Sequence, residues 1–296
     1  MSLHHHVLAA AYYPIKQAKA IGRQLGFASS NQLRVLLYHD IDPRNQASFA
    51  AQMRWLKKSW NFVSAEQFAA MVSGQEPILG RNLLLTFDDG FASNRVVAEE
   101  VLNPMGIKAL FFVMSDFVGL EDVDEARDFI AQNILPGTRA AELPAHWRNM
   151  GWTDLEALLQ AGHCIGGHTR THARLSQLKT LSDLEREIIS GSDVLEQRLG
   201  VSIEHFAYTF GDLASFSVQA LAMARRRYRF VYSGLRGDNA RGAESYALRR
   251  DSAAFQDAFP NYNVFSNNLL GAFLEGAADF RYAEDIATLS SWGGKV

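Results

Sequence analysis

The sequence has very little cysteine, no long apolar run and no marked excess of charge of either sign. Its 296 residues include one cysteine, Cys164, so no disulfide can form within the chain. No window reaches the roughly 18 consecutive apolar residues of a membrane-spanning helix. The net charge of −3 is unlike that of a nucleic-acid-binding domain. We therefore expect a globular protein with no membrane span and no nucleic-acid partner.

The N-terminal segment also lacks the features of a secretory signal. Its first 27 residues contain apolar patches interrupted by basic residues, without a long apolar core or a small-residue cleavage site. Together with the single cysteine, this predicts a cytoplasmic location. The histidines at positions 4–6 resemble a terminal tag and are left out of the predicted site. We assign residues 1–31 to an N-terminal helical extension.

Predicted strands and helices alternate along the rest of the chain. Strands are expected at 34–38, 82–87, 107–114, 162–167, 204–210, 229–233 and 246–250. Helices are expected at 7–26, 46–59, from 64 onward, 91–105, 152–161, 181–199, 214–227 and 261–275. This alternation predicts an α/β fold with a mostly parallel sheet or barrel. In such folds the chemistry gathers at the C-terminal ends of the strands.

Residues 120–150 interrupt this alternation. The segment is rich in acidic residues and carries two prolines and a tryptophan. We expect it to be an insertion or a lid on a single domain that comprises residues 32–296.

The stretch LLLTFDDG, residues 83–90, places two adjacent carboxylates at the end of a predicted buried strand. Asp88 and Asp89 repel each other, and removing them from water is unfavourable. A bound cation would offset both effects. The alternative is an Asx-turn in which one carboxylate caps the following helix. That alternative leaves the second carboxylate without a role.

A second stretch, GGHTRTHARL at residues 166–175, carries two histidines four positions apart. On a helical turn this spacing would place His168 and His172 on one face. Two histidines and one carboxylate make a three-ligand site for a divalent metal with open positions. One aspartate can then be a ligand, while the other accepts a proton from water that the metal activates. Such histidine pairs also occur by chance on surface helices.

These motifs resemble those of a known family. TFDDG at 86–90 and HTRTH at 168–172 resemble the first two motifs of the polysaccharide deacetylase family, the NodB-homology domain of carbohydrate esterase family 4. Three further stretches also resemble the family: RVLLYHDI at 34–41 resembles its opening strand, FAYTFGD at 206–212 its third motif, and YALRRD at 246–251 a late strand that carries an arginine. The first of these is typical of a subgroup with an N-terminal Tyr-His strand. The resemblance covers roughly residues 33–252.

The resemblance implies a distorted (β/α) barrel of about seven strands and metal-dependent hydrolysis of an N-acetyl group on a sugar. By this resemblance Asp88 is the general base and His39 the general acid. It assigns the metal to Asp89, His168 and His172. The implied cofactor is a divalent metal, zinc first and otherwise cobalt, nickel or iron(II), because ligand type alone does not fix its identity. The implied partner is an N-acetylated glycan.

The third motif departs from the family pattern. The backbone N–H near Phe210 is expected to stabilise the oxyanion. Thr209 replaces the usual proline, so we expect a looser turn there. Ala207 stands where some members carry an arginine. We expect Arg250 to reach Asp88 in its place and keep it ionised, the alternative being a surface arginine on a strand.

Two other functions remain open at this stage. Two histidines and one carboxylate also describe the iron site of oxygenases, although those proteins place the carboxylate close to the first histidine in sequence. A glycan-binding protein on the same fold, with impaired catalysis, is the third possibility. The altered third motif is the feature that favours it. The sequence does not indicate which glycan is bound.

Overall fold

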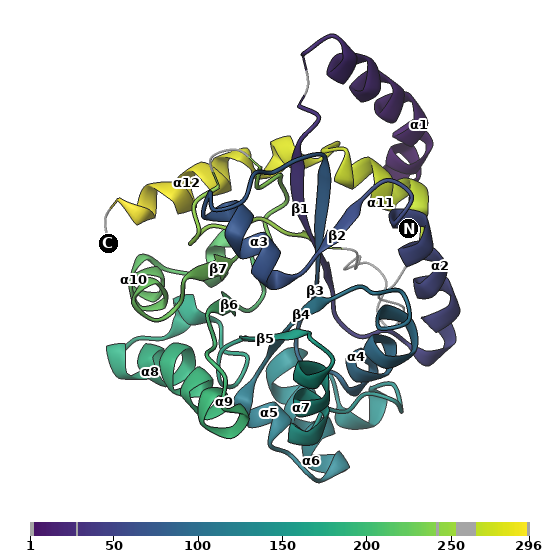
Figure 1. Cartoon of the computed structure of the whole chain (residues 1–296). Coiled ribbons are helices and arrows are strands. Elements are labelled where there is room, and N and C mark those ends of the chain that lie inside the picture. Colours follow the sequence, from purple (N-terminus) through teal and green to yellow (C-terminus); the bar gives the residue numbers. More distant parts are fainter. Residues whose placement is uncertain (1–2, 28, 241–242, 253–264, 295–296) are drawn as a thin grey trace.

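The computed structural model describes residues 3–27, 29–240, 243–252 and 265–294 (Figure 1). Its strands are β1 Gln32–Tyr38, β2 Asn61–Val63, β3 Arg81–Phe87, β4 Ala109–Val113, β5 Cys164–Gly167, β6 His205–Ala207, β7 Phe230–Tyr232 and β8 Asp251–Ser252. The helices before residue 120 are α1 Leu3–Gln24, α2 Gln46–Leu56, α3 Ala65–Val72, α4 Ala92–Val97 and α5 Ser115–Val118. The later helices are α6 Val123–Phe129, α7 Trp152–Gln160, α8 Leu181–Glu185, α9 Gly191–Leu199, α10 Val218–Arg227, α11 Asn267–Leu274 and α12 Ala283–Gly293.

The strands form one parallel sheet in the order β7-β6-β5-β4-β3-β1-β8, and β2 pairs with the first half of β3. The segment around β8 links the two edges of this sheet. Leu248 bridges Tyr232 of β7, whereas Asp251 pairs with Leu36 of β1. Helices surround the sheet, as in a (β/α) barrel (Figure 1). The predicted α/β barrel class is therefore confirmed.

Strands β1 and β3 are buried along almost their whole length and are mainly apolar, although β1 carries a buried arginine, Arg34. Every residue of β1 is buried, and only the first residue of β3 is partly exposed. Mainly apolar strands that are buried on both faces are typical of parallel sheets with helices outside. The rings of Tyr38, Phe87 and Phe111 stack across β1, β3 and β4 with centroids 5.8 and 5.1 Å apart. This core fixes the ends of the strands at one rim.

Several predicted boundaries differ from the structure. The strand expected at 246–250 is a bridge at Leu248 followed by β8, because the chain there crosses between two sheet edges. The helix expected at 181–199 is interrupted by a π-helical turn, Arg186–Ser190. Strand β2 and helix α12 were not predicted. Part of the helix expected at 261–275, residues 261–264, lies outside the described residues. The division into an extension and a barrel domain stays a prediction.

The segment 120–150 is packed rather than irregular. Helix α6 and the π-helical turn Ile130–Ile134 bury apolar side chains against the loops after β3 and β4. Ile130 and Trp147 are almost completely buried in this cluster. Arg127 donates hydrogen bonds to three carbonyl oxygens of residues 140–144 and so closes the segment on itself. The segment forms a wall beside the strand ends.

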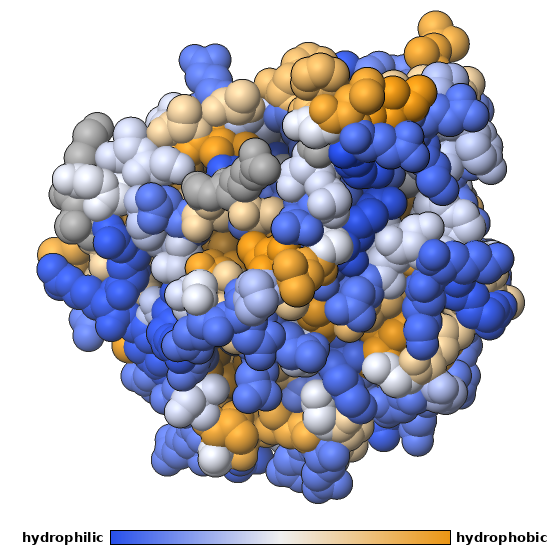
Figure 2. Space-filling view, turned by 45° about the horizontal axis from the view of Figure 1, so that its top comes forward, coloured by the Kyte–Doolittle hydropathy of each residue, from blue (hydrophilic) through white to orange (hydrophobic). Residues whose placement is uncertain are grey.

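Helix α1 lies at the edge of the barrel and packs on α11 (Figure 1). Tyr12 is buried at this contact, directly over Gly271, which has no side chain to obstruct it. The buried carboxylate of Glu275 accepts hydrogen bonds from Arg23 at 2.6 Å and from Arg81 at 2.7 Å. Apolar surface is visible at the top of Figure 2, on the side where Figure 1 places α1. No helix in the described ranges is long and apolar enough to cross a membrane.

We expect Gly271→Ala to displace α1, because the added Cβ would lie 2.7 Å from Cζ of Tyr12. Such overpacking lowers the free energy of unfolding by about 1–3 kcal/mol. Limited proteolysis should cut the variant within α1 sooner than the wild type. The control is Gly119→Ala, whose Cβ would meet nothing closer than 3.5 Å. Equal protection of α1 in the wild type and Gly271→Ala would contradict the contact.

We expect buried His205 to reduce stability in acid. Burial, with a smaller effect of Arg229, lowers the pKa of His205 to about 4. Because the folded-state value lies below the unfolded value, the stabilising effect is complete above pH 6.5 and is lost as the pH falls toward 4. Between pH 7 and pH 5, urea unfolding of the wild type should lose about 2 kcal/mol more than that of His205→Gln. Identical losses in both proteins would show that His205 protonates freely when folded.

Candidate metal centre

The first part of the site is the turn that follows β3. Asp88 and Asp89 come directly after Phe87, and both carboxylates are buried. Asp89 has a φ of 72°, a left-handed conformation that is uncommon for a residue other than glycine. Gly90 continues this conformation with a φ of 83°. The chain turns sharply at these left-handed residues, and the side chains of Asp88 and Asp89 reach different partners.

The second part is the loop Gly167–His172 after β5. The expected helical turn is wrong, because this loop contains no helix. Thr169 and His172 instead have φ values of 62° and 68°. The N–H of His172 donates to Oγ1 of Thr169 at 3.0 Å. The two histidines converge through these left-handed residues rather than through helical spacing.

A buried carboxylate, Glu187, holds the backbone of this loop. Its Oε2 accepts the N–H groups of Arg170 and Thr171 at 3.1 and 2.9 Å, and its Oε1 accepts the Thr171 hydroxyl at 3.0 Å. Glu187 belongs to the π-helical turn between α8 and α9 and is 2% exposed. Such turns often occur at functional sites. Glu187 therefore fixes the loop that carries both histidines.

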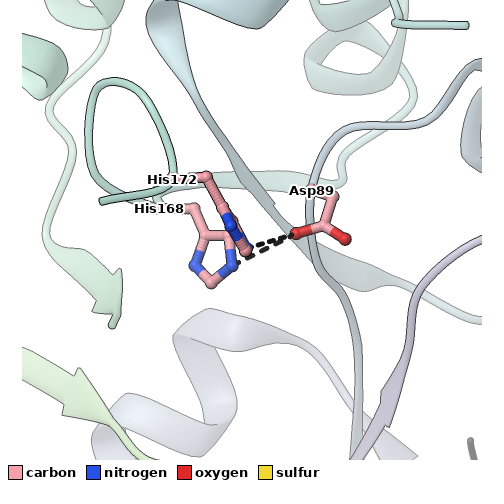
Figure 3. Close-up of side chains that lie close together, drawn as sticks. All are labelled: Asp89, His168 and His172. Atoms are coloured by element: carbon pink, nitrogen blue, oxygen red, sulfur yellow. Dashed lines mark ion pairs between the residues drawn. The ribbon is translucent and has the colours of Figure 1, made fainter. Parts of the chain in front are cut away.

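The imidazoles of His168 and His172 both point toward Asp89 (Figure 3). Each Nε2 lies 3.4 Å from Oδ1 of Asp89, and the three potential ligand atoms lie within 4.8 Å of one another. The Nδ1 atoms contact the carbonyl oxygens of Ala207 at 2.7 Å and Asn133 at 2.9 Å. Since a carbonyl oxygen only accepts, each Nδ1 carries the proton, and each Nε2 is free to bind a metal.

The donor set and its surroundings fit a divalent metal. The 3.4 Å contacts are long for hydrogen bonds, and buried Oδ1 of Asp89 has no hydrogen bond within the described part of the chain. Burial alone would raise the pKa of Asp89, but His168 and His172 outweigh it and hold this pKa well below its usual value. An ionised carboxylate and two imidazole nitrogens are the ligands expected for zinc and related metals.

Asp88 has a different partner. Nη1 of Arg250 donates to Oδ1 of Asp88 at 2.7 Å, and Nε of Arg250 donates to the carbonyl oxygen of Ser233. Arg250 is 1% exposed, so the alternative of a surface arginine is wrong. Oδ2 of Asp88 lies 3.9 Å from Nε2 of His168. One oxygen of Asp88 is therefore held by the guanidinium, while the other lies near the candidate metal ligands.

One cavity of about 620 Å³ contains every residue of the predicted site. The predicted members of its lining are His39, Asp88, Asp89, His168, His172, Phe210 and Arg250. His39 follows β1. Burial raises the pKa of Asp89, and His39 adds to the opposing effect of His168 and His172, which lowers it. His4 and His5, which resembled a tag, also line this cavity. The structure places all seven predicted residues together, and their roles stay predictions.

The cavity wall formed by segment 120–150 is fixed to the loop that carries His39. Asp40 accepts hydrogen bonds from Ser93 Oγ at 2.6 Å and from His146 Nε2 and Trp147 Nε1, both at 2.9 Å. The hydrogen bond to Asp40 raises the pKa of His146 above its usual value. A single carboxylate thus joins the ends of β1 and β3 to the wall. Asp40, Glu187 and the carbonyl of Asn133 were missed because each acts through contacts distant in sequence.

The third motif is held by a side-chain hydrogen bond. Thr209 is completely buried, and its hydroxyl donates to the carbonyl oxygen of Ala173 at 2.6 Å. This contact ties the turn before Phe210 directly to the residue after His172. The Phe210 ring lies against the His172 ring, with centroids 4.8 Å apart, and the Arg174 guanidinium lies 4.1 Å from its centroid. The structure thus shows a specific restraint at the turn that the sequence indicated to be loose.

The fold and the cluster define a class: parallel α/β barrels with a candidate metal centre where the strands end. The polysaccharide deacetylase family model matches residues 77–228, which are 152 of the 296 residues and more than half of the chain. The matched range includes both motifs that carry the candidate metal ligands. The chain therefore belongs to the polysaccharide deacetylase family, whose members are hydrolases.

Individual relatives are distant. The chain is 22% identical to the protein YxkH of Bacillus subtilis (strain 168) over 226 residues, which are 74% of this chain and 70% of YxkH. It is similar in structure to IcaB from Ammonifex degensii, with a TM-score of 0.62, 22% identity and coverage of 83% and 97% of the two chains. It is also similar in structure to the deacetylase PplD of Streptococcus pyogenes, with a TM-score of 0.60, 20% identity and coverage of 83% of this chain and 99% of PplD. Because both identities are below 25%, the similarity to these two structures shows that the fold is shared.

We expect Glu187→Gln to weaken zinc binding although it removes no ligand. The amide cannot accept all three hydrogen bonds that Glu187 accepts, so the histidine loop loses support. Loss of a supporting contact behind metal ligands typically weakens metal affinity about 10–100-fold. Competition with a zinc-binding dye measures this affinity. The control is Glu185→Gln, an exposed carboxylate on the same helical segment. Unchanged affinity in Glu187→Gln would contradict its role.

Proposed function

We propose that this protein is a divalent-metal-dependent hydrolase that removes N-acetyl groups from sugars of a polysaccharide or oligosaccharide. The observation that carries the proposal is that the two adjacent carboxylates have different partners. Asp89 lies with two histidines, whereas Asp88 is held by Arg250 beside them. Membership in the polysaccharide deacetylase family and the shared fold support it.

Asp88 is the proposed general base. The hydrogen bond from Arg250 fixes the orientation of its carboxylate through Oδ1. Oδ2 is then the atom that takes the proton from the attacking water. A positioned base typically contributes about 10²–10⁴-fold to the rate. A bound divalent metal would supply polarisation of the acetamide carbonyl and a lower pKa for the water.

The oxyanion and the leaving amine need further groups. The backbone N–H of Phe210 has no acceptor among the residues that the structure describes, so it can donate to the developing oxyanion. Phe210 has a φ of 65°, and the Thr209 hydroxyl restrains the residue before it. His39, from the end of a different strand, is the proposed acid that protonates the amine. Both residues line the cavity that contains Asp88.

The other two functions are less well supported. The glycan-binding alternative depends on a loose turn at Thr209, where the structure has a buried hydrogen bond. An iron oxygenase would have no use for the buried pair of Asp88 and Arg250. Hydrolysis requires no oxygen, so activity under anaerobic conditions separates the two enzymes.

We expect purified protein to release acetate from a panel of N-acetylated oligosaccharides, to stop releasing it in EDTA, and to resume with added zinc or cobalt. Asp88→Asn should reduce acetate release at least ~100-fold because the amide cannot accept the proton. Zinc should remain bound to the variant, since the three candidate ligands are intact. For both proteins, the released acetate is measured by a coupled assay, and the bound zinc is measured by metal analysis.

The matched control is Asp212→Asn, which alters an exposed carboxylate lining the same cavity. Its acetate release should stay near that of the wild type. Full activity of Asp88→Asn, or activity that EDTA leaves unchanged, would overturn the proposed mechanism. Metal binding without acetate release from any member of the panel would favour the glycan-binding alternative.

A further inference from the structure

The cavity that contains the candidate metal centre is lined by equal numbers of arginines and aspartates. The four arginines are Arg174, Arg236, Arg250 and Arg281, and the four aspartates are Asp40, Asp88, Asp89 and Asp212. A divalent metal at the proposed site would add two positive charges to this balance. The cavity of the metal-bound protein would then carry net positive charge and attract anions.

The aspartates of the lining all have partners of their own. Oδ1 of Asp88 accepts a hydrogen bond from Arg250, and Oδ1 of Asp212 lies 3.4 Å from Nη1 of Arg174. The other two aspartates are held by the hydrogen-bond donors and the histidines described above. The two remaining arginines, Arg236 and Arg281, therefore have no acidic partner among the lining residues that the structure describes.

Arg236 is fixed in place but uses few of its hydrogen-bond donors. It is 7% exposed, and its guanidinium lies 3.9 Å from the centroid of the Phe273 ring. Among the described residues only its Nη2 has an acceptor, the carbonyl oxygen of Ser252 at 2.7 Å. Asp251 lies 3.5 Å from Nη1, which is too long for a good hydrogen bond. A largely buried guanidinium with unused N–H groups at a cavity wall is suited to an anionic ligand.

Arg281 lines the same side of the cavity. Its backbone N–H donates to the carbonyl oxygen of Ala278 at 3.2 Å, and Ala278 packs with Phe273, the residue on which Arg236 lies. The side chain of Arg281 is exposed and makes no ion pair with any residue that the structure describes. One arginine at the wall and one at the rim thus border the same part of the cavity.

Two carboxylates close to these arginines are already neutralised. Buried Arg34 donates to Asp251 at 3.1 and 3.2 Å and to Asp279 at 2.5 and 3.2 Å. Together with Arg236 it balances both negative charges, and neither aspartate lines the cavity. The positive charge of Arg281 is therefore left over, while Arg236 supplies hydrogen-bond donors of fixed orientation.

We propose that Arg236 and Arg281 bind an anionic group, a phosphate or a carboxylate, on the N-acetylated saccharide. Guanidinium groups suit both anions because their planar N–H donors match the oxygen atoms of each. The substrate would then be a charged saccharide whose acetamide reaches the candidate metal centre while its anionic group reaches the two arginines. This inference rests on the proposed function for the saccharide and adds the charge of the substrate to it.

Calorimetric titration of the zinc-loaded full chain with three sugars tests the proposal. The sugars are neutral methyl N-acetylglucosaminide, N-acetylglucosamine 1-phosphate and N-acetylmuramic acid, which carries a carboxylate. We expect one charged sugar to bind at least about tenfold more tightly than the neutral one, and the preferred sugar identifies the anion. High salt should reduce this difference.

Arg236→Gln and Arg281→Gln should each lower the affinity for the preferred charged sugar about tenfold and leave the affinity for the neutral sugar unchanged. In acetate release the same variants should raise KM for the charged sugar without changing kcat. Arg236→Gln also removes contacts to Ser252 and Phe273, whereas Arg281 is exposed, so Arg281→Gln remains informative if the first variant unfolds.

The matched control is Arg226→Gln, which removes an exposed arginine of α10 outside the cavity and should bind all three sugars as the wild type does. Equal binding of charged and neutral sugars by the wild type would overturn the proposal. So would tight binding of a charged sugar that Arg281→Gln leaves unchanged, because the anion would then bind the metal instead. Absence of acetate release from every sugar would contradict the proposed function, and the binding ratios would still decide whether the arginines select an anion.

Discussion

The site depends on how two adjacent buried carboxylates are neutralised. Asp88 and Asp89 follow the same strand, and both are withdrawn from water. Burial disfavours their charged forms unless each has its own positive or hydrogen-bonding partner. Arg250 meets Asp88, and His168 and His172 meet Asp89. The left-handed turn at Asp89 makes this division possible, because it directs the two side chains to different partners.

The barrel supplies those partners from distant parts of the chain. Parallel strands bring their C-terminal ends to one rim, so groups after β1, β3, β5 and β6 and before β8 meet there. A second set of contacts then fixes the loops, chiefly through the buried carboxylates of Asp40 and Glu187. Supporting contacts of this kind determine the orientation of metal ligands and catalytic groups.

The sequence predicted the barrel and the members of the site, but not what positions them. The first motif and the histidine pair are local patterns whose chemistry is visible in the side chains. The role of Asn133 is different, because it contributes a backbone carbonyl that any residue could provide. The left-handed φ values of Thr169 and His172 were also invisible, since threonine disfavours this region and histidine, although enriched in it, occupies it only rarely. Helical spacing thus predicted the proximity of His168 and His172 for an incorrect reason.

The turn before Phe210 can be restrained by a proline ring or, as here, by a hydrogen bond from Thr209. Proline restricts φ in the unfolded chain as well as in the folded one, and so reduces the conformational entropy lost on folding. Threonine offers no such restriction, but its buried hydroxyl donates to Ala173 in the adjoining loop. A hydrogen bond of this kind contributes roughly 1 kcal/mol, comparable to the effect of the proline. It also couples the Phe210 turn to the His172 loop, which proline cannot do. The altered motif is therefore not in itself a sign of lost catalysis.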